Sequence, residues 1–309
     1  VHDCFLMNTH YTNRLYRDET DYEQMRTLLR DTYPLTTPTL NCTLGDLDWW
    51  RATTNDPQVL SKVQLWFDPL GLLVAFTWPG TNQIDVMVRP NHRIVEQAIL
   101  PRAELDYRQA LAPDATNRSF RYWSYEVDTV RNTMLSEHGY TRTADFFTFH
   151  TLPLNQLPEP PLLPAGYTIR HVAGEADLEA RVAVHRAAFH PSRMTVEKHR
   201  NVMASPTYRP ELDLVVVAPD GTFAAYTIVW LDEVNRMGLF EPVGCHPDHQ
   251  RRGLATALMR EGMYRLHALG ATRAHVLSWR DDSAGGFLYP AIGFAVTGKI
   301  YAWEKNLSL

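Results

Sequence analysis

Apolar and polar positions follow the same order twice along the chain. Residues 11–34 and 167–191 each begin with a short stretch typical of a strand, pass through a polar turn, and end in a helical repeat of apolar positions. Each helical repeat starts beside acidic residues, which favour a helix N-terminus. A strand, a turn with proline and glycine, and a second strand follow at 63–78 and at 214–230, which predicts a hairpin in each half.

The second part of each half repeats as well. Apolar strands at 84–88 and 239–245 both run into a proline turn, and a helix and a further strand follow each of them. Both halves close with a short helix, a glycine followed by an aromatic residue, and a last strand, at 138–149 and 292–303. The simplest explanation is a duplicated unit of about 150 residues that mixes helices and strands, which is the α+β class.

A proline-rich segment separates the halves. Residues 152–166 hold five prolines, a density that excludes a helix and favours extended, semi-rigid chain. The total of 309 residues is enough for two domains with a core each. We therefore expect a first domain at 1–151 and a second at 167–309, joined by this linker.

Composition narrows the range of partners. The chain carries 30 basic and 35 acidic side chains, a net charge of −5, which argues against nucleic-acid binding. Cys4, Cys42 and Cys245 are too few and too far apart for a disulfide framework or a CxxC metal motif. No apolar run reaches the roughly 20 residues of a membrane helix, and residues 1–10 lack a signal-peptide pattern. We expect a cytoplasmic protein without membrane or metal partners, and the oligomeric state stays open.

The segment 239–270 carries the chemistry. An apolar strand leads through a short loop into a helix whose leucines share one face and which ends at Gly270. Residues 250–256 therefore lie at the helix N-terminus, where free N–H groups and the helix dipole attract phosphate. Gly253 lets the backbone approach a phosphate, Ala255 keeps a neighbouring position small, and two arginines add positive charge. The loop is a candidate pyrophosphate site, although it is neither a Walker loop nor a GxGxxG motif.

Two motifs in this half resemble those of a known family. Gln250, Gly253 and Ala255 form Gln-x-x-Gly-x-Ala after a strand, and residues 288–294 read Leu-Tyr-Pro-Ala-Ile-Gly-Phe. At this separation the pair is similar to the acetyl-CoA signature of the GCN5-related N-acetyltransferases, the GNAT superfamily. The resemblance implies two tandem GNAT-like domains, each a mixed, mostly antiparallel twisted sheet flanked by helices. Mild departures from the family pattern occur at Ala255, Asp282 and Gly285.

The resemblance also implies where acetyl-CoA, the expected co-substrate, would bind. In this family the fourth and fifth strands part, and the coenzyme arm lies between them like an added strand. The expected contacts are backbone groups of one strand, the helix start that holds the pyrophosphate, and the wall opposite. These three sets are Val243, Gly244 and Cys245; Gln250, Arg251, Arg252, Gly253, Leu254, Ala255 and Thr256; and Asp282, Gly285 and Phe287.

Attack of an amine on a thioester needs an acid and a base. Tyr289 matches the general-acid tyrosine of the family, and a phenol with a pKa near ~10 keeps its proton for the leaving thiolate. The base is left open. Glu241 lies two positions after Leu239, where the family often has a glutamate, and therefore on the same strand face. It is placed to accept the amine proton, to bind a cationic substrate, or to form a salt bridge, and a backbone N–H near 243–245 is the expected oxyanion donor.

The first half lacks these features. Its loop after 89–93 is about two residues shorter than the counterpart and has no glycine, and Leu135 stands at the tyrosine position. We therefore expect a degenerate domain that braces the second half or shapes its acceptor site.

These inferences predict an acetyl-CoA-dependent N-acetyltransferase that acetylates the amine of a small molecule by direct transfer in a ternary complex. Cys245 has no paired base in sequence reach, so a buried filler is expected there rather than an acylated nucleophile. Two alternatives stay open. A non-catalytic acyl-CoA-binding or sensing module would keep residues 250–256 and would not need Tyr289. A peptide or protein N-acetyltransferase would need an open acidic groove.

Overall fold

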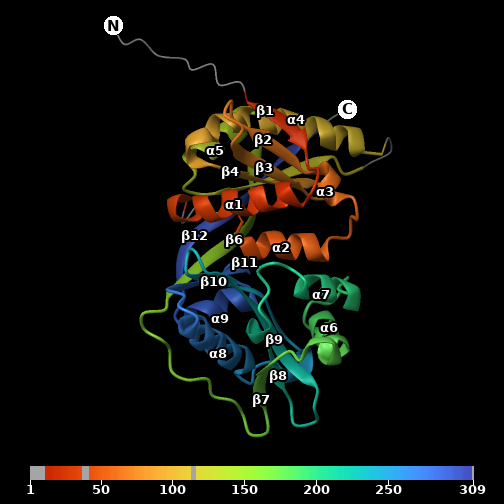
Figure 1. Ribbon diagram of the computed structural model, residues 1–309. Helices are drawn as coiled ribbons and strands as arrows, with labels where there is room; N and C mark the ends of the chain where they lie inside the picture. Colours follow the sequence, from red (N-terminus) through yellow and green to blue (C-terminus); the bar gives the residue numbers. More distant parts are fainter. Residues whose placement is uncertain (1–10, 37–41, 113–115, 308–309) are drawn as a thin grey trace. The chain divides into compact units, whose positions relative to one another are not determined.

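The protein is described by a computed structural model, which covers residues 11–36, 42–112 and 116–307 (Figure 1). Cys4 and the N-terminal stretch 1–10 lie outside the described residues. The chain forms two compact units, and each of them draws on both halves of the sequence. Of the described residues, unit 1 combines 11–36, 56–112, 116–145 and 300–307, and unit 2 combines 42–55 and 146–299.

Unit 1 has the strand order β1-β2-β3-β4-β5-β12, in which only the pair β4–β5 is parallel. Its strands are β1 (Thr12–Leu15), β2 (Gln64–Phe67), β3 (Leu73–Pro79), β4 (Gln83–Val88), β5 (Ser119–Tyr125), the start of β6 (Thr141–Pro153) and the end of β12 (Ala295–Asn306). Its helices are α1 (Glu19–Thr36), α3 (Val59–Lys62), the 3-10 turn η1 (Pro90–Val95), α4 (Glu96–Ala110) and α5 (Thr129–Glu137).

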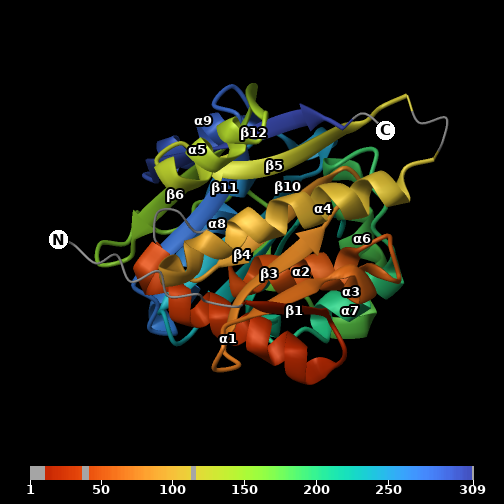
Figure 2. The ribbon, with the colours of Figure 1, turned by 90° about the horizontal axis from the view of Figure 1, so that it is seen from above.

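The core of unit 1 forms where helices cover its sheet. Ile99 and Leu100 of α4 are buried against Val74 of β3 and Val86 of β4. Figure 2 shows α4 along one side of these strands and α1 along the other. Because successive strand residues point to opposite faces, one sheet can bury apolar side chains under both helices.

Unit 2 has the strand order β6-β11-β10-β9-β8-β7, in which only the pair β10–β11 is parallel. Its strands are the end of β6, β7 (Thr168–His171), β8 (Asp213–Val217), β9 (Phe223–Asp232), β10 (Met237–Cys245) and β11 (Arg273–Trp279). Its helices are α2 (Leu44–Thr53), α6 (Leu178–Ala188), α7 (Val196–Met203), α8 (Leu254–Ala268), α9 (Ala284–Ile292) and the 3-10 turns η2 (Gly174–Asp177), η3 (Pro210–Leu212) and η4 (Pro247–His249).

Helices cover both faces of the unit 2 sheet. Val229 and Phe240 pack in the cluster that contains the face of α8, whereas their neighbours Ile228 and Leu239 pack with residues of α2 and α7. Figure 1 shows α8 and α7 on opposite sides of β8 and β9. The mixed, mostly antiparallel sheets with flanking helices confirm the predicted α+β class.

The two sequence halves are interleaved within the units. Helix α2 comes from the first half and packs in unit 2. Strand β6 starts in unit 1 and its last residues pair with β11, whereas β12 starts in unit 2 and its residues 300–306 pair with β5. The two units are defined by which residues lie close together in space, whereas the predicted domains 1–151 and 167–309 are continuous stretches of the chain. The division into these two domains stays a prediction.

The sequence also led us to expect no membrane-spanning helix and no disulfide framework. Within the ranges that the structure covers, no helix is long and apolar enough to cross a membrane. Cys42 is buried and Cys245 is half-buried, and neither forms a disulfide within the described residues.

Candidate active site

The parallel strands β10 and β11 part along their length. They pair only over Met237–Leu239 and Arg273–His275, after which β10 bonds to β9 and β11 bonds to β6. The register of β10 against β9 shifts around Pro242, which has no N–H to donate. Beyond this bulge, residues 243–245 pair with β9 and with no other described strand. Their outer edge is therefore available to an extended ligand.

Helix α8 starts without a capping side chain. Its N-cap is Gly253, whose φ of 75° is left-handed and whose added Cβ would meet no atom within 4 Å. Free N–H groups, open space and positive charge at this point can hold a phosphate ester. Of the predicted contacts, Gln250, Arg251, Arg252 and Gly253 are exposed, Ala255 and Thr256 are half-exposed, and Leu254 is buried in the core.

Helix α9 carries Tyr289 and three predicted coenzyme contacts. Asp282, just before the helix, is exposed, and Phe287 is 70% exposed. Gly285 has a different role, because an added Cβ would lie 2.9 Å from Cε2 of Tyr289 and 3.2 Å from Cβ of Ser278. The missing side chain at Gly285 therefore allows the phenol ring to take its position.

Tyr289 is a buried phenol with a free hydroxyl. It is 7% exposed, and its ring lies 5.4 Å from that of His150 and 6.2 Å from that of Phe294. Burial raises its pKa, and the charge of Glu241 raises it further. No other described residue forms a hydrogen bond with its hydroxyl. The phenol therefore keeps its proton at physiological pH and can donate it to a ligand.

Glu241 faces a second carboxyl group, that of Asp46. Asp46 lies in the first turn of α2, where its Oδ2 accepts a hydrogen bond from the N–H of Thr43 at 2.6 Å. Burial and the neighbouring Asp46 raise the pKa of Glu241 well above its usual value, and burial raises the pKa of Asp46. Asp46 is only 8% exposed, whereas Glu241 is half-buried. The two carboxyl groups therefore resist being ionised together, and the first of them to ionise offers one negative charge to a ligand.

Close packing holds the two carboxyl groups together. An added Cβ on Gly45 would lie 2.4 Å from Cβ of Trp230, so only glycine lets α2 approach β9 here. The indole N–H of Trp230 donates to the backbone carbonyl of Glu241 at 2.7 Å. Sequence reasoning missed α2 and Asp46. The available signal was the capping box from Thr43 to Asp46, which marks a helix start but gives no packing partner.

Other polar candidates near the site are inert. His185 bonds through Nδ1 to the hydroxyl of Tyr226 at 2.6 Å, and burial together with nearby Arg181 lowers its pKa to about 3. Burial raises the pKa of the Cys245 thiol to about 11, so that it is no thiolate nucleophile near neutral pH. In the part of the chain that the structure covers, no group of three or more side chains could hold a metal ion.

Residues 179–294 match the acetyltransferase (GNAT) family. This segment of the chain is a GNAT domain. The protein is therefore an acyltransferase, as the motifs at 250–256 and 288–294 predicted, and the family uses acetyl-CoA as its co-substrate.

The comparisons extend the match beyond this segment. A mycothiol acetyltransferase from Kineococcus radiotolerans is 28% identical over 217 residues, 68% of each chain, and one from Streptomyces griseus is 30% identical over 186 residues, 58% of this chain and 60% of that protein. A GCN5-related N-acetyltransferase structure from Sphaerobacter thermophilus has a TM-score of 0.68 and 20% identity over 97% of this chain and 98% of that one. A tandem GNAT protein from the clavulanic acid biosynthesis pathway has a TM-score of 0.70 and 16% identity over 97% and 99%. These structures confirm the tandem GNAT fold.

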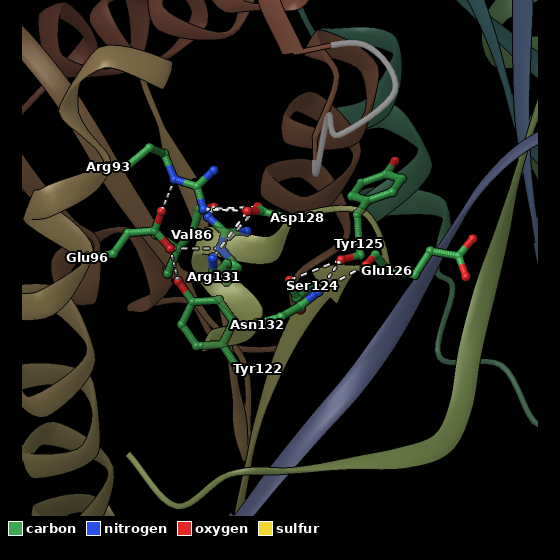
Figure 3. Close-up of polar contacts among 10 residues, drawn as sticks. All are labelled: Val86, Arg93, Glu96, Tyr122, Ser124, Tyr125, Glu126, Asp128, Arg131 and Asn132. Atoms are coloured by element: carbon green, nitrogen blue, oxygen red, sulfur yellow. Dashed lines mark hydrogen bonds and ion pairs between the residues drawn. The ribbon is translucent and has the colours of Figure 1, made fainter. Parts of the chain in front are cut away.

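The matching place in unit 1 is filled by side chains. Strands β4 and β5 pair over two residues and then part, as β10 and β11 do. Here Arg131 of α5 donates from Nε to Glu96 at 2.7 Å and from Nη2 to the carbonyl of Val86 at 3.1 Å. Figure 3 shows Arg93 between Glu96 and Asp128, with ion pairs to both. The guanidinium of Arg131 therefore uses a strand carbonyl that an extended ligand would need.

Two further features distinguish unit 1 from unit 2. Leu135, at the position predicted to match Tyr289, is fully buried. A hollow of about 140 Å³ lies beside the ion pairs, with Arg93, Glu96 and Arg131 among its lining residues. The catalytic degeneracy of the first half stays a prediction.

Proposed function

We propose that the protein transfers the acetyl group of acetyl-CoA directly to the amine of a small molecule. The observation that carries the proposal is the convergence of Tyr289 with the carboxyl pair of Glu241 and Asp46 beside the parted strands β10 and β11. The uncapped start of α8 would hold the pyrophosphate, and residues 243–245 would bond to the coenzyme arm. The first half would supply Asp46 and no second catalytic centre.

The charges of the site suit this chemistry. The ionised carboxylate of the pair attracts the ammonium form of the acceptor, and Glu241 in its ionised form takes one proton from it, so that the neutral amine attacks the thioester carbonyl. The C–N bond forms, the C–S bond breaks, and Tyr289 donates its proton to the leaving sulfur. The phenolate then takes the surplus proton from the nitrogen, which leaves the neutral amide and the free thiol. An N–H at 243–245 stabilises the oxyanion. Direct transfer is supported by the high pKa of Cys245, the thiol on the same strand as Glu241.

The relatives suggest the acceptor to test first. They are named mycothiol acetyltransferases, and their alignments cover 60% to 68% of their own lengths. We therefore propose an amine-bearing small molecule, with amino sugars, polyamines and cysteinyl conjugates as the candidates. A peptide or protein acceptor and a non-catalytic binding module are the competing functions.

A thiol-release screen tests the proposal. The full chain is incubated with acetyl-CoA and each amine, and free coenzyme A is measured together with the mass of the acetylated product. Release that depends on a small amine is the expected result. Tight acetyl-CoA binding without release for any amine or peptide would favour the binding module, and release with peptides alone would favour the protein acetyltransferase.

The carboxyl pair should govern the acidic limb of the pH profile. Replacing Asp46 by asparagine removes the charge that helps to raise the pKa of Glu241, so this pKa falls. Glu241 then stays ionised to lower pH, and the acidic limb of kcat/KM should move down by about one pH unit. Asparagine keeps an oxygen for the Thr43 N–H. An unmoved limb, with wild-type melting temperature, would contradict this coupling.

The start of α8 should control coenzyme affinity. Gly253→Ala places a methyl group where a phosphate would approach, and the Kd for acetyl-CoA should rise about tenfold. Gly270→Ala is a matched control, because Gly270 has a φ of 85° and equally open surroundings near the other end of the helix. Both variants carry the same backbone strain. Equal affinities in calorimetric titrations of the two variants would refute the phosphate site.

A further inference from the structure

A buried polar pair lies directly behind Tyr289. His150 of β6 is 1% exposed, and its Nε2 lies 2.9 Å from Oγ of Ser278 on β11. His150 stands opposite Val276 in the β6–β11 register, so its side chain shares a face with Ser278. Val276 and Tyr289 belong to the same core cluster, which places the pair on the side of the sheet that supports the phenol.

His150 touches the ring that the proposed mechanism depends on. The imidazole and the phenol meet edge-to-face, with ring centroids 5.4 Å apart and planes at 75°. Ser278 completes the support, because both its Cβ and the ring of Tyr289 border the space at Gly285. The three side chains come from β6, β11 and α9, so the phenol is fixed to the sheet and not only to its own helix.

Burying the imidazole of His150 in the core destabilises the fold relative to an apolar side chain. Burial lowers the pKa of His150, against a smaller opposing effect of Asp281, so the ring is neutral. Its Nδ1 is buried and has no hydrogen-bonding partner in the described structure. An unsatisfied buried nitrogen destabilises the fold, a cost that an apolar side chain of similar size would avoid. Unlike an apolar side chain, the imidazole can bond to Ser278, and this bond fixes the plane of the ring against Tyr289.

We propose that His150 is a positioning residue that, held by Ser278, orients the phenol of Tyr289 toward the leaving sulfur. The inference rests on the proposed role of Tyr289 as proton donor. A first-half residue would thereby set the geometry of the acid, as Asp46 sets the charge of the base. Small misplacements of a reacting group reduce rates steeply, so the effect should fall on kcat and not on coenzyme binding.

Four variants of the full chain test the proposal by steady-state kinetics. His150→Ala should lower kcat about tenfold and leave the KM for acetyl-CoA within about twofold. His150→Phe keeps an aromatic edge but loses the bond to Ser278, so its loss of kcat should be about as small as that of Ser278→Ala. Ser278→Ala releases the imidazole without a large cavity and should lower kcat about threefold, which keeps the test open if His150→Ala fails to fold. His275→Ala is the matched control, since His275 is equally buried in the same ladder but lies on the other face.

A double-mutant cycle separates this proposal from the one it rests on. If His150 acts through Tyr289, His150→Ala should not lower kcat further in the Tyr289→Phe variant. An equal loss in both backgrounds, or an equal loss for His275→Ala, would overturn the positioning role. A Tyr289→Phe variant with wild-type kcat would instead overturn the acid role itself. A Tyr289→Phe loss without a His150→Ala or Ser278→Ala loss would reject positioning alone.

Discussion

Replacing Tyr289 by phenylalanine is expected to lower kcat about a hundredfold, the usual contribution of a positioned general acid. The substitution removes only the hydroxyl, which has no partner among the described residues, so no buried acceptor is left unsatisfied. The packing with His150 and Phe294 is kept. The melting temperature and the Kd for acetyl-CoA should therefore stay at wild-type values, while the coenzyme leaves as a poorly stabilised thiolate.

A second tyrosine provides the control for this experiment. Tyr264 on α8 donates its hydroxyl to the carbonyl of Pro158 at 3.0 Å, far along the chain from the acid. Tyr264→Phe loses this bond, so it should cost about 1 kcal/mol of stability and leave kcat unchanged. Because burial and Glu241 raise the pKa of Tyr289, the wild-type profile should show no alkaline loss of activity from this phenol below pH 10. Thiol-release rates across pH 6–10 measure kcat of the control variant and the alkaline limb of the wild type, and thermal melts measure the stability of the control variant.

Glu241→Gln is expected to produce the other large loss, again about a hundredfold in kcat. Glutamine has nearly the shape of glutamate but cannot take the amine proton. The variant also separates the roles that the sequence left open: a base affects kcat, whereas a residue that only binds a cation affects the KM of the acceptor. A raised acceptor KM with unchanged kcat would therefore reassign Glu241 to binding. Glu261→Gln on α8, which removes a carboxylate paired with Arg265, is the control for charge.

The stability of the same variant gives an independent check. The raised pKa of Glu241 means that the folded protein holds its proton more tightly than the unfolded chain does. Ionising Glu241 in the fold therefore costs stability, and this cost appears as the pH rises above the ordinary pKa near ~4.5. Glu241→Gln should consequently lose less stability than the wild type when the pH is raised from 5 to 8. Thermal melts at both pH values measure the difference.

Local pattern was enough to predict most of unit 2. The alternation in β8 to β10, the hairpin turns and the leucine face of α8 are set by neighbours in sequence, and the structure has them within two or three residues of the predicted positions. Gly253 at the start of α8 and Pro242 in the bulge follow for the same reason, because glycine and proline act on their own backbone.

The long-range part of the site could not be predicted in this way. Helix α2 is short, and its place against Trp230 depends on the small size of Gly45. The pairing of β6 with β11 joins segments more than a hundred residues apart, and no local signal encodes such a contact. For this reason sequence reasoning placed Tyr289 and Glu241 but missed Asp46 and His150, the two partners that come from the first half.

Strand β6 runs from unit 1 into unit 2 and β12 runs from unit 2 into unit 1, which has a consequence for biosynthesis. Residues 300–306 of β12 pair with β5, and they follow β5 by more than 170 positions along the chain. The partner of β6 arrives with β11, more than a hundred residues after β6 itself. A nascent chain must therefore carry two open strand edges until these distant partners have been made, and open edges recruit other chains. Chaperone demand during synthesis, rather than the stability of the finished enzyme, should limit its yield.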